Sequence, residues 1–334
     1  MSIIIIAEAG INHNGSIELA KCLVEAAADS GVDYIKFQTF KTKNLVTKTA
    51  KKAAYQQKNM NDNDNTQYNM LEKLELSEED HCILLGNCKQ RKIKFLSTAF
   101  DLESIEFLSK LDLDYWKIPS GEITNYPYLK RIGRENKPVF LSSGMSTIYD
   151  VKAAINVLVE NGTNKQKITV LHCNTQYPTP MKDVNLLAMQ TIAKEMDVRV
   201  GYSDHTMGIE IPIAAAALGA TVIEKHFTLD RNMEGPDHKA SLEPNEMKAM
   251  IEAIRNVEKA LGTSEKTVSN SERENKNIAR KSIVAARNIL KGETLNENNL
   301  STKRPGNGIS PMEWENIIGK AAIRKFDEDE LIEI

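Results

Sequence analysis

Eight short runs of β-branched and aromatic residues alternate with longer segments of helical periodicity in the first 262 residues of this chain. The predicted strands are residues 3–7, 34–37, 94–97, 115–118, 139–142, 168–172, 199–202 and 222–225. Helical segments follow them, for example 18–30, 78–91, 151–160 and 245–261, and glycines stand where helices commonly end, at Gly31, Gly162 and Gly262.

This alternation predicts a parallel sheet, because two parallel strands need a crossover of helix length between them. Eight strand–helix units in roughly 260 residues match the size of an α/β (β/α)8 TIM barrel. The alternative is an open doubly wound sheet, but no GxGxxG turn follows the first predicted strand.

The pattern changes near residue 263, where Ser, Thr, Glu, Asn and Lys replace the apolar periodicity. We therefore predict a catalytic barrel over 1–262, a solvated linker over 263–281, and a small β-rich domain over 282–334 with strands near 282–285 and 320–323. Within the barrel, the connection 41–77 is long, and its Asn- and Asp-rich middle, 59–65, fits no regular element. Long connections at this end of a barrel are typical of lids or oligomer contacts.

Composition excludes several classes of function. The chain has 334 residues, 41% of them hydrophobic, and a formal net charge of −3, so it lacks the concentrated positive charge that nucleic-acid or anionic-membrane binding needs. No apolar run approaches the roughly 18 residues of a membrane span. Four cysteines without a CxxC pair are typical of reduced thiols in a cytoplasmic protein.

Two histidines follow consecutive predicted strands, His205 in SDHT and His226 in KHF. Neighbouring strands lie about 4.8 Å apart, so two imidazoles at adjacent strand ends can converge on one divalent ion. Other coordination positions would stay open, as a catalytic metal requires. The alternative is that each histidine is a packed or hydrogen-bonded core residue.

Further polar residues stand at the ends of the other predicted strands. Lys36 and Lys117, with the hydroxyls of Thr98, Ser120 and Ser143, can form a receptor for an anion that carries both phosphate and carboxylate. The alternative for each lysine is an ordinary salt bridge.

Three carboxylates accompany these residues. Glu8 and Glu122 are available as general base, as partners of sugar hydroxyls or as part of a metal's environment, and the sequence does not divide these roles. Asp237 lies in a Gly-Pro-Asp-His turn after the last strand, which holds it over the mouth of the barrel or makes it a simple turn cap.

Nine motifs spread over essentially the whole chain resemble the sialic acid synthase family. They are AEAGINHNG (7–15), IKFQTF (35–40), KIPSGEITNYP (117–127), SSGM (142–145), HCNTQYPTP (172–180), GYSDHT (201–206), EKHFTLD (224–230), GPDHKASLEP (235–244) and KRPGNGIS (303–310). The resemblance implies a synthase that condenses phosphoenolpyruvate with an open-chain N-acetylated hexosamine, giving a nine-carbon 2-keto acid and phosphate. It also implies a TIM barrel followed by an antifreeze-like (SAF) domain, in a domain-swapped homodimer.

The resemblance assigns roles to individual residues. It implies catalytic functions for Glu8, Glu122 and Lys117, and a Mn²⁺, or another divalent ion, held by His205 and His226. The residues expected to bind phosphoenolpyruvate are Lys36, Thr98, Lys117, Ser120, Ser143 and Ser203. The residues expected near the sugar are Gln38, Tyr177, Asp237 and Arg304, the last reaching the partner subunit's site from the small domain.

Within the family, FQTF, SGEITN and GPDHKASLEP resemble the branch that makes N,N'-diacetyllegionaminic acid, which favours 2,4-diacetamido-2,4,6-trideoxymannose as the acceptor. The first alternative is an N-acetylneuraminate synthase that uses N-acetylmannosamine. The others are a Schiff-base aldolase with Lys117 or Lys36 as nucleophile, and a non-catalytic barrel that binds a sugar phosphate.

Overall fold

The structure is a computed structural model that describes residues 2–60 and 66–334. The chain divides into two compact units, Met1–Gly262 and Thr263–Ile334, and each has its own hydrophobic core. Within the described ranges, none of the helices combines the length and apolar character that crossing a membrane requires.

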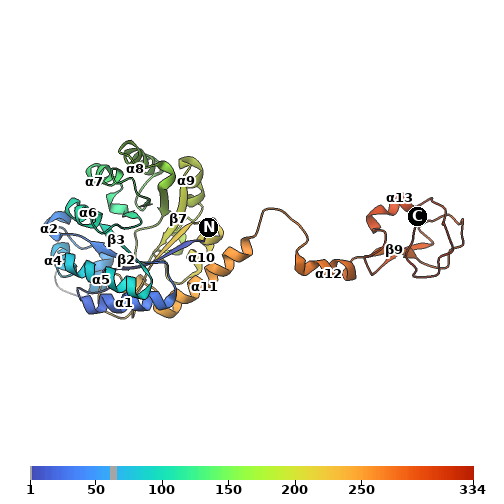
Figure 1. The fold of residues 1–334 in the computed structure, drawn as a ribbon, viewed down its shortest axis with the longest axis horizontal. Coiled ribbons are helices and arrows are strands. Elements are labelled where there is room, and N and C mark those ends of the chain that lie inside the picture. Colours follow the sequence, from blue (N-terminus) through green and yellow to red (C-terminus); the bar gives the residue numbers. More distant parts are fainter. Residues whose placement is uncertain (1, 61–65) are drawn as a thin grey trace. The chain divides into compact units, whose positions relative to one another are not determined.

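In the described part of the first unit, eight parallel strands close into a barrel in sequence order, which confirms the predicted (β/α)8 fold (Figure 1). The strands are β1 Ile4–Gly10, β2 Tyr34–Thr39, β3 Lys94–Ala99, β4 Trp116–Ile118, β5 Val139–Ser142, β6 Ile168–His172, β7 Arg199–Asp204 and β8 Val222–His226. The neighbouring pairs, including β1 with β8, are parallel.

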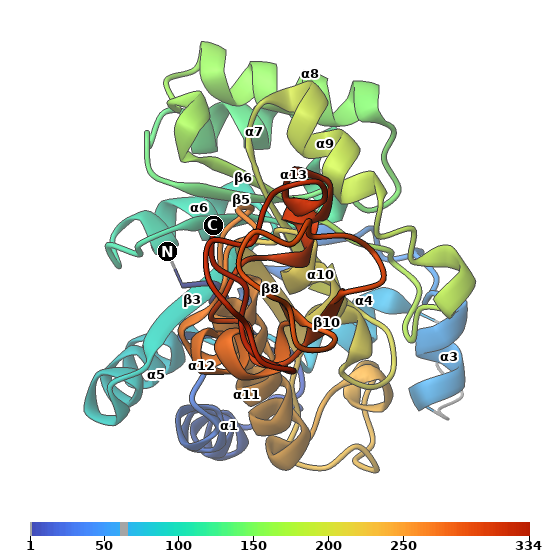
Figure 2. The same cartoon turned by 90° about the vertical axis from the view of Figure 1, so that its right-hand side faces the viewer.

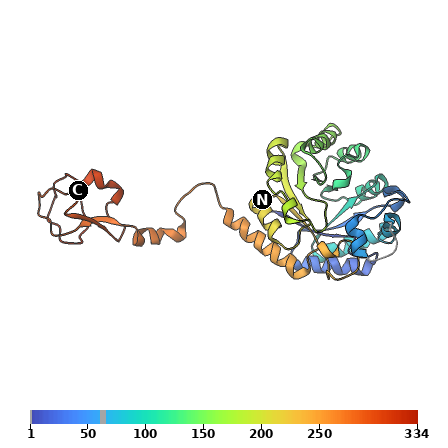
Figure 3. The same ribbon diagram turned by 180° about the vertical axis from the view of Figure 1, so that it is seen from behind.

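An outer ring of helices surrounds the strands, one after each strand. They are α1 Ile17–Ser30, α5 Glu78–Arg91, α6 Leu102–Ser109, α7 Tyr126–Gly133, α8 Ile148–Glu160, α9 Ala188–Met196, α10 Glu210–Ala217 and α11 Pro244–Leu261. Figure 2 shows α5, α7, α8 and α9 at the periphery of the unit. The first and last ring helices, α1 in blue and α11 in orange, pack side by side and close the ring (Figure 3).

Local capping explains where these helices begin and end. The hydroxyl of Ser16 caps the start of α1, and Gly31, at φ +85°, ends it as predicted. Helix α8 begins at Ile148, three residues before the predicted start, because Thr147 and Asp150 form a reciprocal capping box that the periodicity alone did not reveal.

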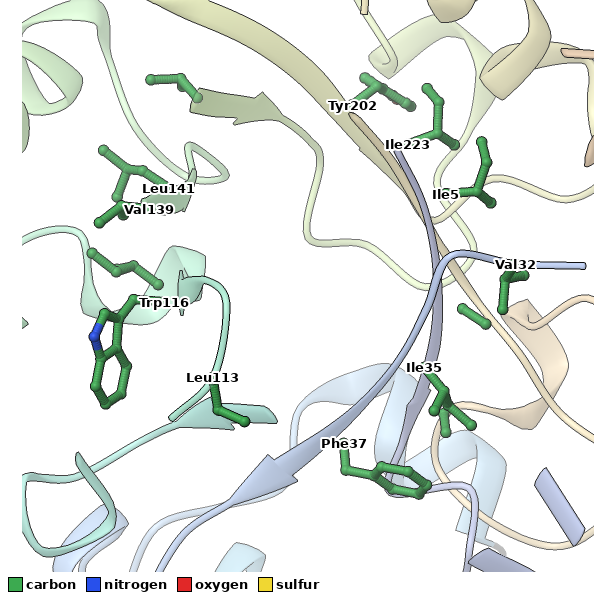
Figure 4. Packing of buried hydrophobic residues seen from close by; sticks show 14 of the residues in the cluster. Ile5, Val32, Ile35, Phe37, Leu113, Trp116, Val139, Leu141, Tyr202 and Ile223 are labelled. Carbon is green, nitrogen blue, oxygen red and sulfur yellow. The ribbon is translucent and has the colours of Figure 1, made fainter. Parts of the chain in front are cut away.

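Residue alternation along the strands sorts the side chains onto two faces. Outward-facing residues such as Ile5, Ile35 and Ile223 pack between the strands and the helices (Figure 4). Inward-facing apolar residues fill the barrel interior: Ile6, Tyr34, Leu96, Phe140, Leu171 and Val222. The next inward-facing residue of each strand, two positions closer to its carboxyl end, is in most strands polar or charged. The apolar layer therefore forms the floor of the site.

The long connection between β2 and α5 contains three short helices, α2 Thr42–Leu45, α3 Ala54–Met60 and α4 Gln67–Glu72. Residues 61–65, most of the stretch left unassigned from the sequence, lie outside the described residues. An apolar cluster of its own, here called the loop cluster, stabilises the connection; its members are Ile11, Phe40, Met70, Leu71 and Leu74, with Leu45, Val46, Met60 and Phe100 packed against them.

The second unit contains helix α12 Asn270–Ala279, strands β9 Ser282–Ala285 and β10 Leu300–Lys303, a 3-10 turn at Pro311–Glu313, and helix α13 Trp314–Ile317. The two strands are antiparallel and cover a small core of nine buried residues in this unit. The predicted strand at 320–323 forms only one bridge in the described chain, from Ala321 to Thr294.

Helix α12 was not predicted, because its residues are all exposed and show no apolar face. A capping box of Ser269 and Glu272 stabilises its start, and Gly306 N–H and Arg304 Nε donate to the carbonyls of Asn277 and Ala279 near its end.

Candidate active site

A cavity of about 420 Å³ opens at the carboxyl ends of the barrel strands. Side chains from the ends of all eight strands line it, which is where chemistry takes place in this fold. They are Glu8, Lys36, Gln38, Thr98, Lys117, Ser142, Cys173, Ser203, Glu224 and His226, joined by Ser120, Glu122, Tyr177, His205 and Asp237 from the loops.

Four charged side chains form a buried cluster at the base of this cavity. Lys36 Nζ contacts the carboxylate of Glu8 and lies 3.6 Å from Glu224 Oε2. Lys117 Nζ lies 3.2 Å from Glu224 Oε1. No more than 5% of any of these four side chains is exposed, so the carboxylates offset charges that would otherwise be buried unpaired.

The pKa values show how strongly the cluster is coupled. Burial lowers the pKa of a lysine, but at Lys36 the carboxylates of Glu224 and Glu8 outweigh burial and raise the pKa. At Lys117 burial dominates and lowers the pKa. Burial raises the pKa of Glu224, yet Lys117 and Lys36 outweigh it and hold this pKa well below its usual range. Glu224 is therefore an ionised carboxylate between two lysines.

Three of the predicted hydroxyls lie in the cavity. Thr98 Oγ1 accepts a hydrogen bond from Lys36 Nζ at 3.0 Å, and Ser203 Oγ donates to Glu224 Oε1 at 2.7 Å. Ser120 Oγ accepts from the backbone N–H of Gly144 at 3.0 Å. A Cβ at Gly144 would lie 2.7 Å from this oxygen, so only glycine allows the close approach.

Ser143 is placed differently from what we expected. Its hydroxyl donates to the Leu171 carbonyl at 3.2 Å, and the side chain lines a neighbouring cavity. Alternation along β5 points Ser142 inward instead, and among the described residues the buried Ser142 Oγ has no hydrogen-bond partner. Ser142 is thus the hydroxyl that β5 offers to a ligand in the lysine cavity.

The two predicted imidazoles meet at the same cavity, with ring centroids 5.2 Å apart. Burial lowers the pKa of His205 to about 4 and that of His226 well below its usual value, so both rings are neutral near pH 7. The Nδ1 of His205 is 2.5 Å from the Asn174 carbonyl, which leaves Nε2 as its free ring nitrogen.

These residues suit a divalent cation. Within the described part of the chain, His226 Nδ1 and Asp237 Oδ1 are buried without a hydrogen-bond partner, and the Asp237 carboxylate lies 4.0 Å from His226 Nδ1. Neutral imidazole with carboxylate oxygen is a donor set that divalent transition metals accept. In the described ranges, no group of three or more His, Cys, Asp or Glu side chains is placed to hold a metal ion.

The remaining carboxylates have distinct surroundings. Burial raises the pKa of Glu122, whose Oε2 accepts a hydrogen bond from Asn125 at 2.5 Å. Burial and the charge of Glu8 raise the pKa of Asp237 to about 7. Glu8 also accepts from Gln38 Nε2 at 3.3 Å. Burial also raises the pKa of Glu8, so three carboxyl groups with raised pKa values face one cavity.

Tyr177 and Arg304 are the two remaining predicted site residues. Tyr177 lies with its ring centroid 4.1 Å from that of His205. Arg304 lies exposed in the second unit, after β10, and its Nε donates to the Ala279 carbonyl at 3.0 Å.

Sequence reasoning missed Glu224 and Tyr55. Alternation along β8 could have found Glu224, because it shares the inward parity of Val222 and His226, whereas Lys225 points outward and pairs with Asp204. No pattern marks Tyr55, because a long βα connection has no periodicity from which to predict its fold.

Comparison with known proteins identifies the family. A profile of the NeuB family matches residues 23–266, and one of the SAF domain matches residues 280–333. An N,N'-diacetyllegionaminic acid synthase of Campylobacter jejuni is 55% identical over 98% of both chains. Another from Legionella pneumophila is 48% identical over 96% of this chain and 90% of its own length.

A solved structure agrees with both matches. The N-acetylneuraminic acid (sialic acid) synthetase of Leptospira borgpetersenii, crystallised with citrate, superposes with a TM-score of 0.72 and 30% identity, covering 82% of this chain and 90% of its own. The resemblance that the nine motifs indicate is thereby confirmed, as is the antifreeze-like C-terminal domain. This chain belongs to the NeuB family of sialic acid synthases.

Proposed function

We propose that this chain is an N,N'-diacetyllegionaminic acid synthase, which condenses phosphoenolpyruvate with 2,4-diacetamido-2,4,6-trideoxymannose and water and releases phosphate. The observation that carries the proposal is one cavity in which two lysines and two neutral imidazoles face the same space. The identity of 55% and 48% to synthases of that name supports the choice of acceptor.

Phosphoenolpyruvate occupies the lysine end of the cavity in this proposal. Lys36 and Lys117 bind its phosphate and carboxylate as point charges, and Thr98, Ser120, Ser142 and Ser203 supply hydrogen-bonding hydroxyls. In the free protein Glu8 and Glu224 balance both lysines, so the substrate anions enter in competition with these carboxylates.

The acceptor's aldehyde faces His205, His226 and Asp237. The two imidazoles would hold a divalent cation such as Mn²⁺, with the Asp237 carboxylate beside them, and the bound ion would supply Lewis-acid polarisation of the aldehyde. Both imidazoles are already neutral at pH 7, so they can donate a lone pair without first losing a proton. Gln38 and Tyr177 line the cavity beside the acceptor.

The chemistry balances as two additions and one elimination. C3 of the enol phosphate attacks the aldehyde carbon, a C–C bond forms, and the aldehyde oxygen takes up a proton. Water then adds at C2 and loses one proton. The C2–O bond to phosphate breaks, the new C2 hydroxyl becomes the 2-keto group, and its proton leaves with the phosphate. We assign the base that receives the proton from water to Glu122, because it has no lysine partner in the described chain, whereas Glu8 is ion-paired with Lys36.

We also propose that the chain works as a homodimer in which the small domain serves the partner subunit's site. Support comes from the SAF match and from Arg304, an exposed guanidinium in a KRPGNG turn. A guanidinium donates in a planar fork, which suits the carbonyl oxygen of an acyl group.

An isotope experiment tests the reaction class. With phosphoenolpyruvate labelled by ¹⁸O at the bridging position, the label should leave in inorganic phosphate, one phosphate per nine-carbon acid formed. Retention of the label in the organic product would contradict cleavage of the C–O bond. Incorporation of pyruvate under borohydride would instead support the aldolase with a lysine nucleophile.

A further inference from the structure

Helix α3 of the long β2–α5 connection brings an aromatic ring into the active-site cavity. Tyr55 stacks on Tyr177 with ring centroids 5.1 Å apart and an angle of 21° between the planes. Tyr177 in turn contacts His205. Asn59, on the same helix, donates to the Pro236 carbonyl at 2.7 Å, next to Asp237. Helix α3 is thereby fixed to the loops that follow β6 and β8.

Besides its charged and polar residues, the cavity is lined in part by apolar side chains. Five side chains compose what we call the apolar wall: Leu45, Val46, Tyr55, Leu71 and Phe100. Four of them, all but Tyr55, also belong to the loop cluster or pack against it. The β2–α5 connection therefore presents one side of its own small core to the substrate cavity. This placement gives the wall a fixed shape, because residues packed into a core have few alternative rotamers.

We propose that the apolar wall selects the acceptor sugar by receiving its methyl groups, those of C6 and of the 4-acetamido substituent. The inference rests on the proposed function. With phosphoenolpyruvate at the lysines and the aldehyde at the imidazoles, the far end of the sugar extends towards the remaining lining. The side chains of Leu45, Val46, Leu71 and Phe100 cannot hydrogen-bond the 4- and 6-hydroxyls of N-acetylmannosamine, so a hydroxyl placed against them would lose water without replacement.

Two substitutions test the wall without touching the charged cluster. Val46→Thr keeps the volume of a half-buried side chain and adds a hydroxyl, and Tyr55→Ala removes the stacked ring. The readout is kcat/KM for 2,4-diacetamido-2,4,6-trideoxymannose divided by kcat/KM for N-acetylmannosamine. A methyl group in an apolar pocket is worth roughly 10- to 200-fold in kcat/KM, so each variant should lower this ratio by about tenfold or more. The KM for phosphoenolpyruvate should change by less than about threefold, because a contact with the acceptor leaves the anion site intact.

Two further variants separate selection from folding. Tyr55→Phe keeps the ring and should retain the ratio that Tyr55→Ala loses. Tyr68→Ala removes a ring from α4 of the same connection, outside the described lining of the cavity, and should also retain it. Thermal unfolding of each variant shows whether the barrel is intact, and the volume-conserving Val46→Thr keeps the test decisive if Tyr55→Ala fails to fold.

The outcomes distinguish this inference from the proposed function. A wild-type preference for the diacetamido acceptor that falls in Val46→Thr and Tyr55→Ala supports the apolar wall. The same wild-type preference retained in both variants overturns the wall and leaves the proposed function standing. A wild-type enzyme without that preference overturns the proposed acceptor and the wall with it.

Discussion

Replacing Glu224 by glutamine tests the buried charge cluster. The substitution keeps the shape of the side chain and removes the only charge that lies beside both Lys36 and Lys117 in the described structure, at 3.6 and 3.2 Å. Removing one member of a buried ion pair costs about 3–5 kcal/mol, because the partner charge stays buried and unpaired. At roughly 2–4 °C per kcal/mol for a domain of this size, the barrel's Tm should fall by about 6–20 °C.

Phosphate should rescue the variant. An anion between the lysines replaces the lost carboxylate, so saturating phosphate should raise the Tm of Glu224→Gln by more than that of the wild type. The assay is thermal unfolding with and without phosphate. Glu246→Gln is the matched control, because Glu246 pairs with Arg231 at a partly exposed position where a salt bridge is worth about 1 kcal/mol or less. An unchanged Tm in Glu224→Gln, or equal stabilisation of both proteins by phosphate, would refute the cluster's role.

Three further predictions follow from the site. Chelation should abolish turnover, and Mn²⁺ should restore it. His205→Ala and His226→Ala should each reduce the bound metal measured by elemental analysis. Full activity of either variant after chelation would contradict the two-imidazole site. A mixture of the Arg304→Ala and His226→Ala variants should regain activity after subunit exchange, because one site of a domain-swapped heterodimer has both residues. If exchange is verified and activity does not rise, Arg304 does not contribute to the partner subunit's site. Gly10→Ala should destabilise the barrel by about 1–2 kcal/mol and reduce kcat/KM, because φ at Gly10 is +53° and a Cβ would lie 3.1 Å from Glu8 Oε1. Unchanged unfolding and kinetics would show that this position tolerates a side chain.

The strand–helix alternation was sufficient to predict the barrel, because short strand-like runs and longer helical segments follow one another eight times, and glycines mark the ends of several helices. The strand ends placed His205, His226, Lys36 and Lys117 at one face, and the structure brings all four to one cavity. The prediction of which strand residues face the barrel interior was less successful. Ser143 was expected in the anion site, although alternation along β5 points Ser142 inward. Glu224 was missed, although it faces the barrel interior from the same side of β8 as His226.

Other features depend on contacts that sequence patterns do not record. The pairing of Tyr55 with Tyr177 joins segments more than a hundred residues apart. Helix α12 lies in a segment without an apolar face, where periodicity predicts no helix, and a capping box and hydrogen bonds from Arg304 and Gly306 stabilise its two ends. Such elements depend on tertiary contacts or single hydrogen bonds, and the composition of the segment does not indicate them.

Direct competition between the two acceptors tests which sugar the enzyme condenses with phosphoenolpyruvate. 2,4-diacetamido-2,4,6-trideoxymannose and N-acetylmannosamine are supplied at equal concentration with phosphoenolpyruvate and Mn²⁺, and the two products are separated by mass. The diacetamido acceptor should be preferred by at least about tenfold, since burying its additional methyl groups is worth roughly 1–3 kcal/mol each. Equal use of the two acceptors, or a preference for N-acetylmannosamine, would contradict the legionaminic acid assignment.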